Sequence, residues 1–248
     1  MGRIIFIGAG PGAADLITVR GARLLAQADV VLHDALIDLE LRQHAPNARW
    51  VPVGKRGFGK STAQSEINAQ LVRMAREFDV VVRLKGGDPS IFGRLEEELQ
   101  AVAAAGIPCE VVPGVTAALA AAASARRPLT RRGTGRSVAL TTAVTREGEL
   151  RVSCSADTEV LYMAGQQIAA LAPRLLEAGW RADTPVLVVS NAGLANARFS
   201  EHRVATLAEG AAVHFGQPAV VIVGTGAGIA AEGLSLDSRQ GLMGTPPT

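Results

Sequence analysis

The sequence predicts an α/β protein built from two consecutive α/β domains. Over the first 112 residues, short runs of β-branched residues alternate with longer amphipathic stretches, and a more strand-rich pattern follows Pro113-Gly114. A length of 248 residues is enough for two domains of about 100–150 residues each. We therefore expect an N-terminal domain over residues 1–112, a C-terminal domain over 113–232 and a loose tail over 233–248.

The N-terminal domain is expected to hold a mostly parallel sheet with helices on both faces. Predicted strands cover residues 3–7, 29–32, 50–53, 80–84 and 108–112, and predicted helices cover residues 16–27, 63–77 and 92–105. Because strands and helices alternate, the strands run parallel and their carboxyl ends meet at one edge. Ligands of such sheets bind at that edge.

The C-terminal domain begins with an alanine-rich helix and a basic segment. Strands are predicted at residues 137–142, 159–163, 186–190, 199–207 and 219–223, and one long helix is predicted at residues 168–178. Since this helix is the one long amphipathic stretch between those strands, we expect a domain richer in strands than the first.

Composition narrows the class of protein. Hydrophobic residues make up 48% of the chain and charged residues 19%, which suits a packed core and argues against disorder. The longest stretch without a charged side chain, residues 210–231, has an apolar centre of only five residues, too short to span a membrane. Met1 leads directly into a strand, so we expect a cytoplasmic location. Two cysteines and four histidines without ligand spacing predict no metal site.

A glycine-rich loop after the first strand has two interpretations. Gly8, Gly10 and Ala13 nearly match a dinucleotide-binding fingerprint, and Asp34 stands where the ribose-binding acid of such proteins is found. This favours an NAD- or FAD-dependent oxidoreductase. Alternatively the loop is a tight turn without a ligand, and Asp34 caps a helix that starts at Ala35.

Two further strand ends carry glycines. Gly86 and Gly87 expose backbone groups after the fourth predicted strand, and Gly114 follows the fifth. Asp88 is suited either to accept hydrogen bonds from ligand hydroxyls or to cap the next helix. Three glycine-bearing ends in one sheet predict the floor of a cleft.

Five arginines lie close together after the alanine-rich helix. They are Arg126, Arg127, Arg131, Arg132 and Arg136. Arginine offers a planar fork of donors that matches carboxylate or phosphate oxygens, so the cluster favours a polyanionic partner. The alternative is a solvated basic loop. A net charge of +2 and 4% aromatic residues argue against nucleic acid as the partner.

Nine segments in order resemble the motifs of the tetrapyrrole methylase family, and they span nearly the whole chain. They are IGAGPG (residues 7–12), DLIT (15–18), ADVVLHDALI (28–37), VGKRG (53–57), RLKGGDPSIFGR (83–94), VVPGVTAAL (111–119), PLTRRG (128–133), YMAG (162–165) and TPVLVVSNA (184–192). One such segment is weak, whereas nine in order are specific. The resemblance implies the family fold, in which two α/β domains hold a cofactor in the cleft between them and the first glycine loop holds no pyrophosphate.

The resemblance also implies an activity. It predicts S-adenosyl-L-methionine-dependent C-methylation of uroporphyrinogen III, twice in succession, giving precorrin-2 for siroheme or cobalamin biosynthesis, with S-adenosyl-L-homocysteine as the second product. It further implies a homodimer, and the short apolar stretches predict no membrane partner. The chain departs from the family pattern at Leu95 and at residues 125–127, beside the expected substrate cleft. A methyltransferase for a later precorrin is therefore the near alternative.

The family's site residues are carried over only where the motifs match. For the cofactor they are Pro11, Gly86, Gly87, Asp88, Ile91, Thr116, Ala117, Met163 and Ala192. For catalysis they are Asp34 as base, Lys55 as acid and Arg94 in the substrate cleft. The candidates for the substrate's eight carboxylates come from the arginine cluster rather than from a family motif, and they are Arg126, Arg127, Arg131 and Arg132. The sulfonium methyl group is already electrophilic, so the enzyme must chiefly align the reactants and move protons.

Overall fold

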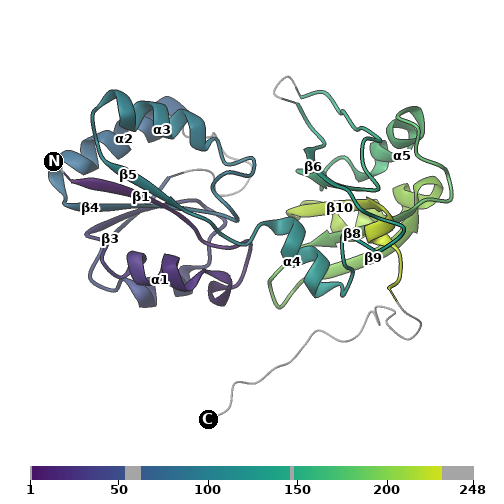
Figure 1. Ribbon diagram of the computed structural model, residues 1–248, viewed down its shortest axis with the longest axis horizontal. Coiled ribbons are helices and arrows are strands. Elements are labelled where there is room, and N and C mark those ends of the chain that lie inside the picture. Colours follow the sequence, from purple (N-terminus) through teal and green to yellow (C-terminus); the bar gives the residue numbers. More distant parts are fainter. Residues whose placement is uncertain (1, 54–62, 146–147, 231–248) are drawn as a thin grey trace, which may run out of the picture. The chain divides into compact units, whose positions relative to one another are not determined.

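The chain forms two compact units, Met1–Thr116 and Ala117–Thr248. The computed structural model describes residues 2–53, 63–145 and 148–230, so the expected tail at 233–248 lies outside the described residues. Each unit contains one five-stranded sheet with helices packed on it (Figure 1). The predicted α/β class is confirmed.

The first unit is a parallel sheet. Its strands are β1 (Arg3–Gly8), β2 (Val30–His33), β3 (Arg49–Pro52), β4 (Val80–Lys85) and β5 (Cys109–Val112), in the order β3-β2-β4-β1-β5. All neighbouring pairs are parallel. From β1 the chain crosses toward β2, whereas from β4 it crosses the other way toward β5. The strand order therefore reverses between β1 and β4, and a ligand of such a sheet binds outside the carboxyl ends at this point.

Helices cover both faces of this sheet, as the alternating pattern predicts. The helices α2 (Gln64–Glu77) and α3 (Leu95–Ala104) lie on one face and α1 (Val19–Leu25) on the other (Figure 1). Phe6 of β1 packs in the same cluster as residues of α2 and α3, whereas its neighbour Ile7 packs with Leu25 of α1. Since successive side chains of a strand point to opposite faces, a strand covered on both sides is apolar throughout.

Two helices are shorter than the sequence predicts. A 3₁₀ turn (Ala14–Leu16) precedes α1, which begins after Thr18, because the Thr18 hydroxyl accepts a hydrogen bond from the Gly21 amide at 3.0 Å. The helix expected at residues 92–105 begins only at Leu95. Arg94, directly before it, has a left-handed backbone with φ of 53°, which a continuous α-helix excludes.

The second unit contains a mixed sheet. Its helices are α4 (Ala117–Ser124), α5 (Ile168–Glu177) and α6 (Ala211–His214), and its strands are β6 (Val138–Thr142), β7 (Thr158–Tyr162), β8 (Pro185–Ser190), β9 (Arg198–Arg203) and β10 (Ala219–Gly224). The order is β6-β7-β10-β8-β9, in which only β6 and β7 pair in parallel. The strand predicted at 199–207 ends at Arg203, because the chain turns into a 3₁₀ helix (Val204–Gly210) that buries Val204 and Leu207.

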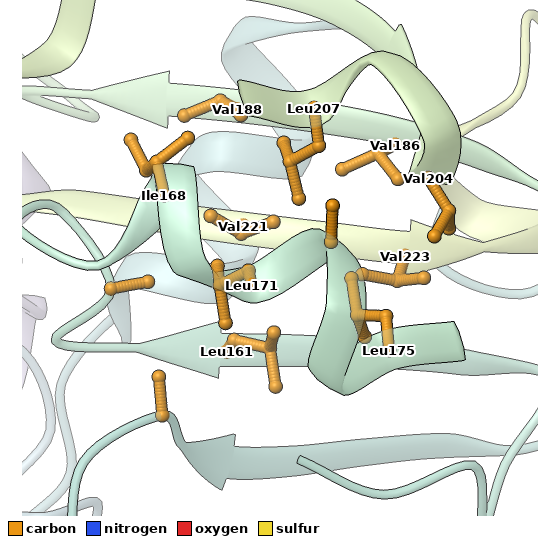
Figure 2. Packing of buried hydrophobic residues seen from close by; sticks show 13 residues of the cluster. Leu161, Ile168, Leu171, Leu175, Val186, Val188, Val204, Leu207, Val221 and Val223 are labelled. Carbon is orange, nitrogen blue, oxygen red and sulfur yellow. The ribbon is translucent and has the colours of Figure 1, made fainter. Parts of the chain in front are cut away.

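The core of the second unit lies between α5 and this sheet (Figure 2). Ile168, Leu171 and Leu175 follow the spacing of one helix face and are buried against Val221 and Val223 of β10, among others. Among the described helices of both units, none is long and apolar enough to cross a membrane. Because β10 runs antiparallel to β7 and β8, the carboxyl ends of β7 and β8 lie at the same sheet edge as the start of β10.

Candidate active site

Three glycine-bearing loops of the first unit pack backbone against backbone. The Gly10 amide donates to the Gly87 carbonyl at 3.3 Å, and the Gly87 amide donates to the Gly10 carbonyl at 2.7 Å. A Cβ atom on Gly8 would lie 2.6 Å from Cα of Gly114, and one on Gly114 would overlap the Gly87 carbonyl oxygen. The loops after β1, β4 and β5 therefore approach this closely only without side chains.

This packing disfavours the dinucleotide interpretation of the first loop. A dinucleotide fold directs the free amides of its glycine loop and the start of its helix at a pyrophosphate. Here the Gly10 amide is bonded to Gly87, and α1 begins only at Val19. The glycines at positions 8 and 10 serve the contact between loops.

Gly86 and Gly87 differ in what they offer a ligand. Gly87 has a φ of 68°, a left-handed backbone that favours glycine. Gly86 is exposed and has no such constraint, and a Cβ atom built on it would meet nothing within 4 Å. The backbone at Gly86 therefore borders open space that a ligand can enter.

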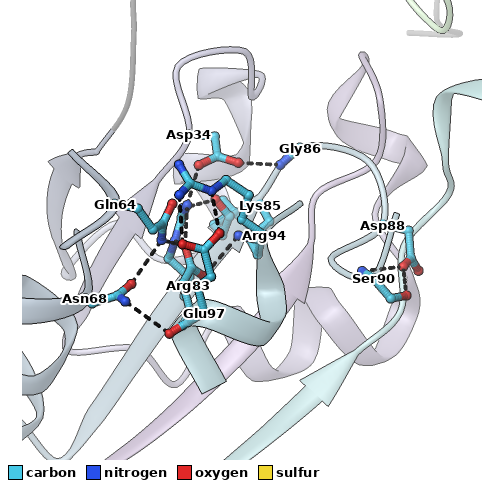
Figure 3. Close-up of polar contacts among 12 residues, drawn as sticks. Asp34, Gln64, Asn68, Arg83, Lys85, Gly86, Asp88, Ser90, Arg94 and Glu97 are labelled. Atoms are coloured by element: carbon cyan, nitrogen blue, oxygen red, sulfur yellow. Dashed lines mark hydrogen bonds and ion pairs between the residues drawn. The ribbon is translucent and has the colours of Figure 1, made fainter. Parts of the chain in front are cut away.

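Asp88 fixes the shape of the same loop. One carboxylate oxygen accepts from the amide of Ser90 at 2.8 Å and from its hydroxyl (Figure 3). The other accepts from the Gly114 amide at 2.9 Å. Burial raises the pKa of this carboxyl, but the hydrogen bonds from Ser90 and Gly114 outweigh it and hold the pKa below its ordinary value. Because α3 begins at Leu95, Asp88 is not its cap. Instead it joins the loop of residues 86–89, called the GGDP loop below, to the loop after β5.

The other cofactor candidates of this unit lie in the same loops. Pro11 and Ile91 are half-buried, and Thr116 is 8% exposed. A Cβ atom on Gly87 would lie 4.0 Å from Cα of Thr116, so the loops after β4 and β5 are in van der Waals reach of each other. The candidate residues at 86–88 and Thr116 are thus brought together at one sheet edge.

Asp34 lies directly after β2 and is held by charged partners (Figure 3). One carboxylate oxygen accepts from Nη2 of Arg83 at 2.6 Å, and the other accepts from the Gly86 amide at 3.1 Å. It does not cap the following helix, a 3₁₀ segment (Leu39–His44) whose N-cap is Asp38. Asp34 therefore faces the GGDP loop, and its side chain is 33% exposed.

Arg83, Lys85 and Glu98 form a group of buried charges next to Asp34, and no function was predicted for this group from the sequence. Glu98 of α3 accepts from Nε of Arg83 at 3.2 Å and from Nζ of Lys85 at 2.9 Å. The side chains of Arg83, Lys85 and Glu98 are at most 3% exposed. Burial and the nearby Arg83 guanidinium lower the pKa of Lys85, although the Glu98 carboxylate acts in the opposite direction. In the sequence, the sign of this group is that two basic residues, Arg83 and Lys85, lie in the otherwise apolar strand β4.

Arg94 lies near this group, since its guanidinium interacts electrostatically with the Glu98 carboxylate. Arg94 is exposed and forms a two-pronged ion pair with Glu97, with both N–O distances at 2.7 Å. Lys55, the expected acid, lies outside the described residues. Within the described part of the chain, no group of three or more His, Cys, Asp or Glu side chains is placed to hold a metal ion.

In the second unit, the candidates Met163 and Ala192 lie at the edge formed by the carboxyl ends of β7 and β8, and the candidate Ala117 is the first residue of α4. Met163 follows β7 and is 57% exposed, with a left-handed φ of 57°. Ala192 follows β8 after Asn191, which has a φ of 52°. The Tyr162 hydroxyl accepts from the Ala118 amide at 3.2 Å, which ties the start of α4 to the end of β7. Two left-handed non-glycine residues at one edge are typical of a functional site.

The arginine cluster divides into buried and exposed members. The Arg127 side chain is fully buried and pairs with Glu201 of β9. Arg131 donates to the Ile229 carbonyl at 3.0 Å and also to the Gly228 carbonyl. These two arginines hold the polypeptide chain itself.

Arg126 and Arg132 are exposed, and Arg126 borders a groove of about 620 Å³. The groove is mainly apolar and is lined by Leu119, Ala122, Ala123, Arg126, Arg127, Pro128, Leu129, Thr130, Val138 and Leu140. A guanidinium at the rim of an apolar groove suits a ligand with an apolar body and an anionic periphery.

The family model of the tetrapyrrole (corrin/porphyrin) methylases matches residues 3–208. The chain belongs to this family. The resemblance carried by the nine sequence motifs is thereby confirmed.

Relatives of this tetrapyrrole methylase include named enzymes and solved structures. It is 40% identical to a uroporphyrinogen-III C-methyltransferase of Pseudomonas aeruginosa, a match that covers 90% of the chain and 93% of the relative. It is 42% identical to a siroheme synthase of Edwardsiella ictaluri over 90% of the chain but only 49% of that longer protein. A uroporphyrin-III C-methyltransferase of Thermus thermophilus, crystallised with S-adenyl homocysteine, superposes with a TM-score of 0.79 at 38% identity, over 90% of this chain and 97% of that one.

The loop packing predicts the stability of two glycine variants. Gly8→Ala should lower the free energy of unfolding by about 1–3 kcal/mol, because its Cβ meets backbone that cannot rotate away. Gly86→Ala is the matched control, since its Cβ enters open space and should change stability by no more than about 0.5 kcal/mol. Urea unfolding measures both. Equal stability of the two variants would show that the loops do not depend on this close approach.

Proposed function

We propose that this tetrapyrrole methylase transfers the methyl group of S-adenosyl-L-methionine to carbon atoms of uroporphyrinogen III, twice in succession, giving precorrin-2 and S-adenosyl-L-homocysteine. The observation that carries the proposal is one sheet edge at which open glycine backbone at Gly86 adjoins a partly exposed, fixed carboxylate at Asp34. The high identity to uroporphyrinogen-III C-methyltransferases over nearly the whole chain supports the choice of substrate.

We propose the following residues as contacts of the cofactor. In the first unit the backbone at Gly86 and Gly87 would contact it, and Asp88 would act by holding that loop to Gly114. The other residues proposed to bind it are Pro11, Ile91, Thr116, Ala117, Met163 and Ala192. The related Thermus enzyme crystallised with S-adenyl homocysteine supports this cofactor.

In the proposed reaction, a pyrrole carbon attacks the sulfonium methyl group. A carbon–carbon bond forms, the carbon–sulfur bond breaks, and its electron pair stays on sulfur. The macrocycle is left with a positive charge, which is relieved when it loses a proton. We assign the acceptance of that proton to Asp34, whose carboxylate is 33% exposed beside Gly86. Lys55 and Arg94 remain the proposed acid and substrate-cleft arginine.

For the substrate's carboxylates we propose direct contacts from Arg126 and Arg132, which are exposed. The apolar groove beside Arg126 would take part of the macrocycle. Arg127 and Arg131 are proposed to act indirectly, since their guanidinium groups hold Glu201 and the carbonyls of Gly228 and Ile229. Their role is to fix the segment that carries the exposed arginines.

We propose a homodimer in the cytoplasm that supplies siroheme synthesis, cobalamin synthesis or both. The siroheme synthase relatives support the siroheme branch. Both cysteines are unpaired and exposed, which suits a reducing compartment. Light scattering that gave a mass of 25.7 kDa at micromolar concentration would contradict the dimer.

The experiment that tests the function is anaerobic incubation of the purified protein with uroporphyrinogen III and S-adenosylmethionine, followed by mass spectrometry. We expect the addition of two methyl groups. Methylation of a later precorrin, with uroporphyrinogen III untouched, would move the substrate assignment to the near alternative. Binding of NAD or FAD without any affinity for S-adenosylhomocysteine would overturn the proposal as a whole.

The cofactor assignment predicts the effect of a side chain at Gly86. Gly86→Val should leave the melting temperature unchanged and weaken S-adenosylhomocysteine binding by about tenfold or more, a loss of about 1.4 kcal/mol or greater. Gly86→Ala should give a smaller loss. Titration calorimetry measures both affinities. Wild-type affinity in the valine variant would mean that the cofactor does not approach this backbone.

The division of the arginines predicts different outcomes for neighbouring substitutions. Arg126→Ala should remove a charge-assisted contact of about 1.5–3 kcal/mol and raise KM for the tetrapyrrole by roughly ten- to a hundredfold, with the melting temperature unchanged. Arg127→Ala should instead lower the melting temperature, because it removes a buried partner of Glu201. Steady-state kinetics and thermal unfolding distinguish the two. The same KM change in both variants would contradict the division.

A further inference from the structure

The buried charges behind Asp34 are more than the fold requires. Arg83, Lys85 and Glu98 are at most 3% exposed and lie on the apolar side of the sheet that α2 and α3 cover. Buried charges are costly even when paired, and well-packed apolar residues in their place are often as stable or more so. We therefore expect the group to serve the residue that it contacts at the site.

The contacts of the group connect the buried Glu98 to Asp34 through Arg83. Glu98 is fixed by Lys85 at 2.9 Å and by Nε2 of Gln64 at 3.2 Å. Arg83 is fixed in turn by Glu98, and its Nη1 donates to the Leu84 carbonyl at 3.2 Å. The same Nη2 atom of Arg83 lies 3.2 Å from Glu98 and 2.6 Å from Asp34. The guanidinium thus joins the buried carboxylate to the partly exposed one.

We propose that Arg83 and Glu98 are positioning residues that hold the Asp34 carboxylate in place, aimed at the reacting macrocycle beside the Gly86 backbone. This inference rests on the proposed function, in which Asp34 accepts the proton. Arg83 and the Gly86 amide each hold one oxygen of Asp34, so the carboxylate cannot turn away. Glu98 lies behind Arg83 and keeps the guanidinium from following the substrate.

Within the described residues, the charged groups around Asp34 are Arg83 and Lys85 on β4 and Glu98 on α3, and Arg94 lies near enough to Glu98 for an electrostatic interaction. His33, the residue before Asp34, contacts the Asp34 backbone carbonyl through Nδ1 at 3.0 Å. Of these groups, Arg83 is the cation whose guanidinium contacts the Asp34 carboxylate.

Three variants test this role. Arg83→Met should lower kcat by about ten- to a hundredfold, less than the whole contribution of a general base, and leave KM within about twofold. It should also move the acid limb of the kcat–pH profile to higher pH by roughly one unit or more, since loss of the cation favours protonated Asp34. Arg83→Lys keeps the positive charge, so its kcat–pH profile should lie close to that of the wild type, whereas its kcat should recover less. Glu98→Gln should lower kcat while moving the limb to lower pH, because it removes a negative charge.

The matched control is Val102→Ala, which lies one turn from Glu98 on α3 and is fully buried in the core. It should lower the melting temperature and leave the pH profile as in the wild type. If Arg83→Lys and Glu98→Gln behave like this control, the group is merely structural and the proposal is wrong. The opposite shifts expected from the Arg83 and Glu98 variants cannot arise from loss of stability.

A second measurement separates this inference from the proposed function. The carboxyl carbon of Asp34 is followed by NMR against pH in aspartate-labelled protein and assigned with Asp34→Asn. Its titration should move to higher pH in Arg83→Met and to lower pH in Glu98→Gln. An unchanged titration would overturn the positioning role even in an active enzyme, whereas an inactive wild type with the expected shifts would overturn only the function.

Discussion

The contact on which the first unit depends is the backbone pair between Gly10 and Gly87, at the point where the strand order reverses. It exists because Gly8 and Gly114 leave no Cβ atoms between the loops after β1, β4 and β5. Once these loops are joined, the Gly86 amide is placed against Asp34, and the open face of the GGDP loop is fixed. The candidate site is therefore a consequence of close packing between main chains rather than of any one side chain.

Different physical interactions fix the candidate residues at the sheet edge of each unit. In the first unit the edge is organised by charge, since Asp34 is held by Arg83 and by a backbone amide. In the second unit it is organised by backbone conformation, since Met163 and Asn191 adopt left-handed φ values at the ends of β7 and β8. A left-handed methionine is costly in isolation, and the pairing of β7 with β10 on one side and β6 on the other keeps it in place.

Much of the fold could be predicted from sequence because period-2 and helical patterns are local. The five strands of the first unit were expected within about one residue of their observed bounds. The late start of α3 and the 3₁₀ segment after β9 were not, since they depend on a left-handed Arg94 and on burial of Val204. Of the site, the nine motifs indicated the family and its candidate residues. The group of Arg83, Lys85 and Glu98 was missed because nothing in a sequence shows that α3 lies over β4.

The sequence by itself determined the α/β class, the order of the elements and the family, because hydrophobic periodicity and motif residues are properties of the linear chain. Only the tertiary structure decided what equivalent residues do. Among four arginines of similar spacing, two hold the polypeptide chain and two are exposed, and of two adjacent glycines one needs its left-handed backbone while the other borders open space. These differences in role arise from neighbours distant in sequence, such as Glu201, Gly114 and Ile229. Such neighbours come next to the arginines and glycines only when each unit folds.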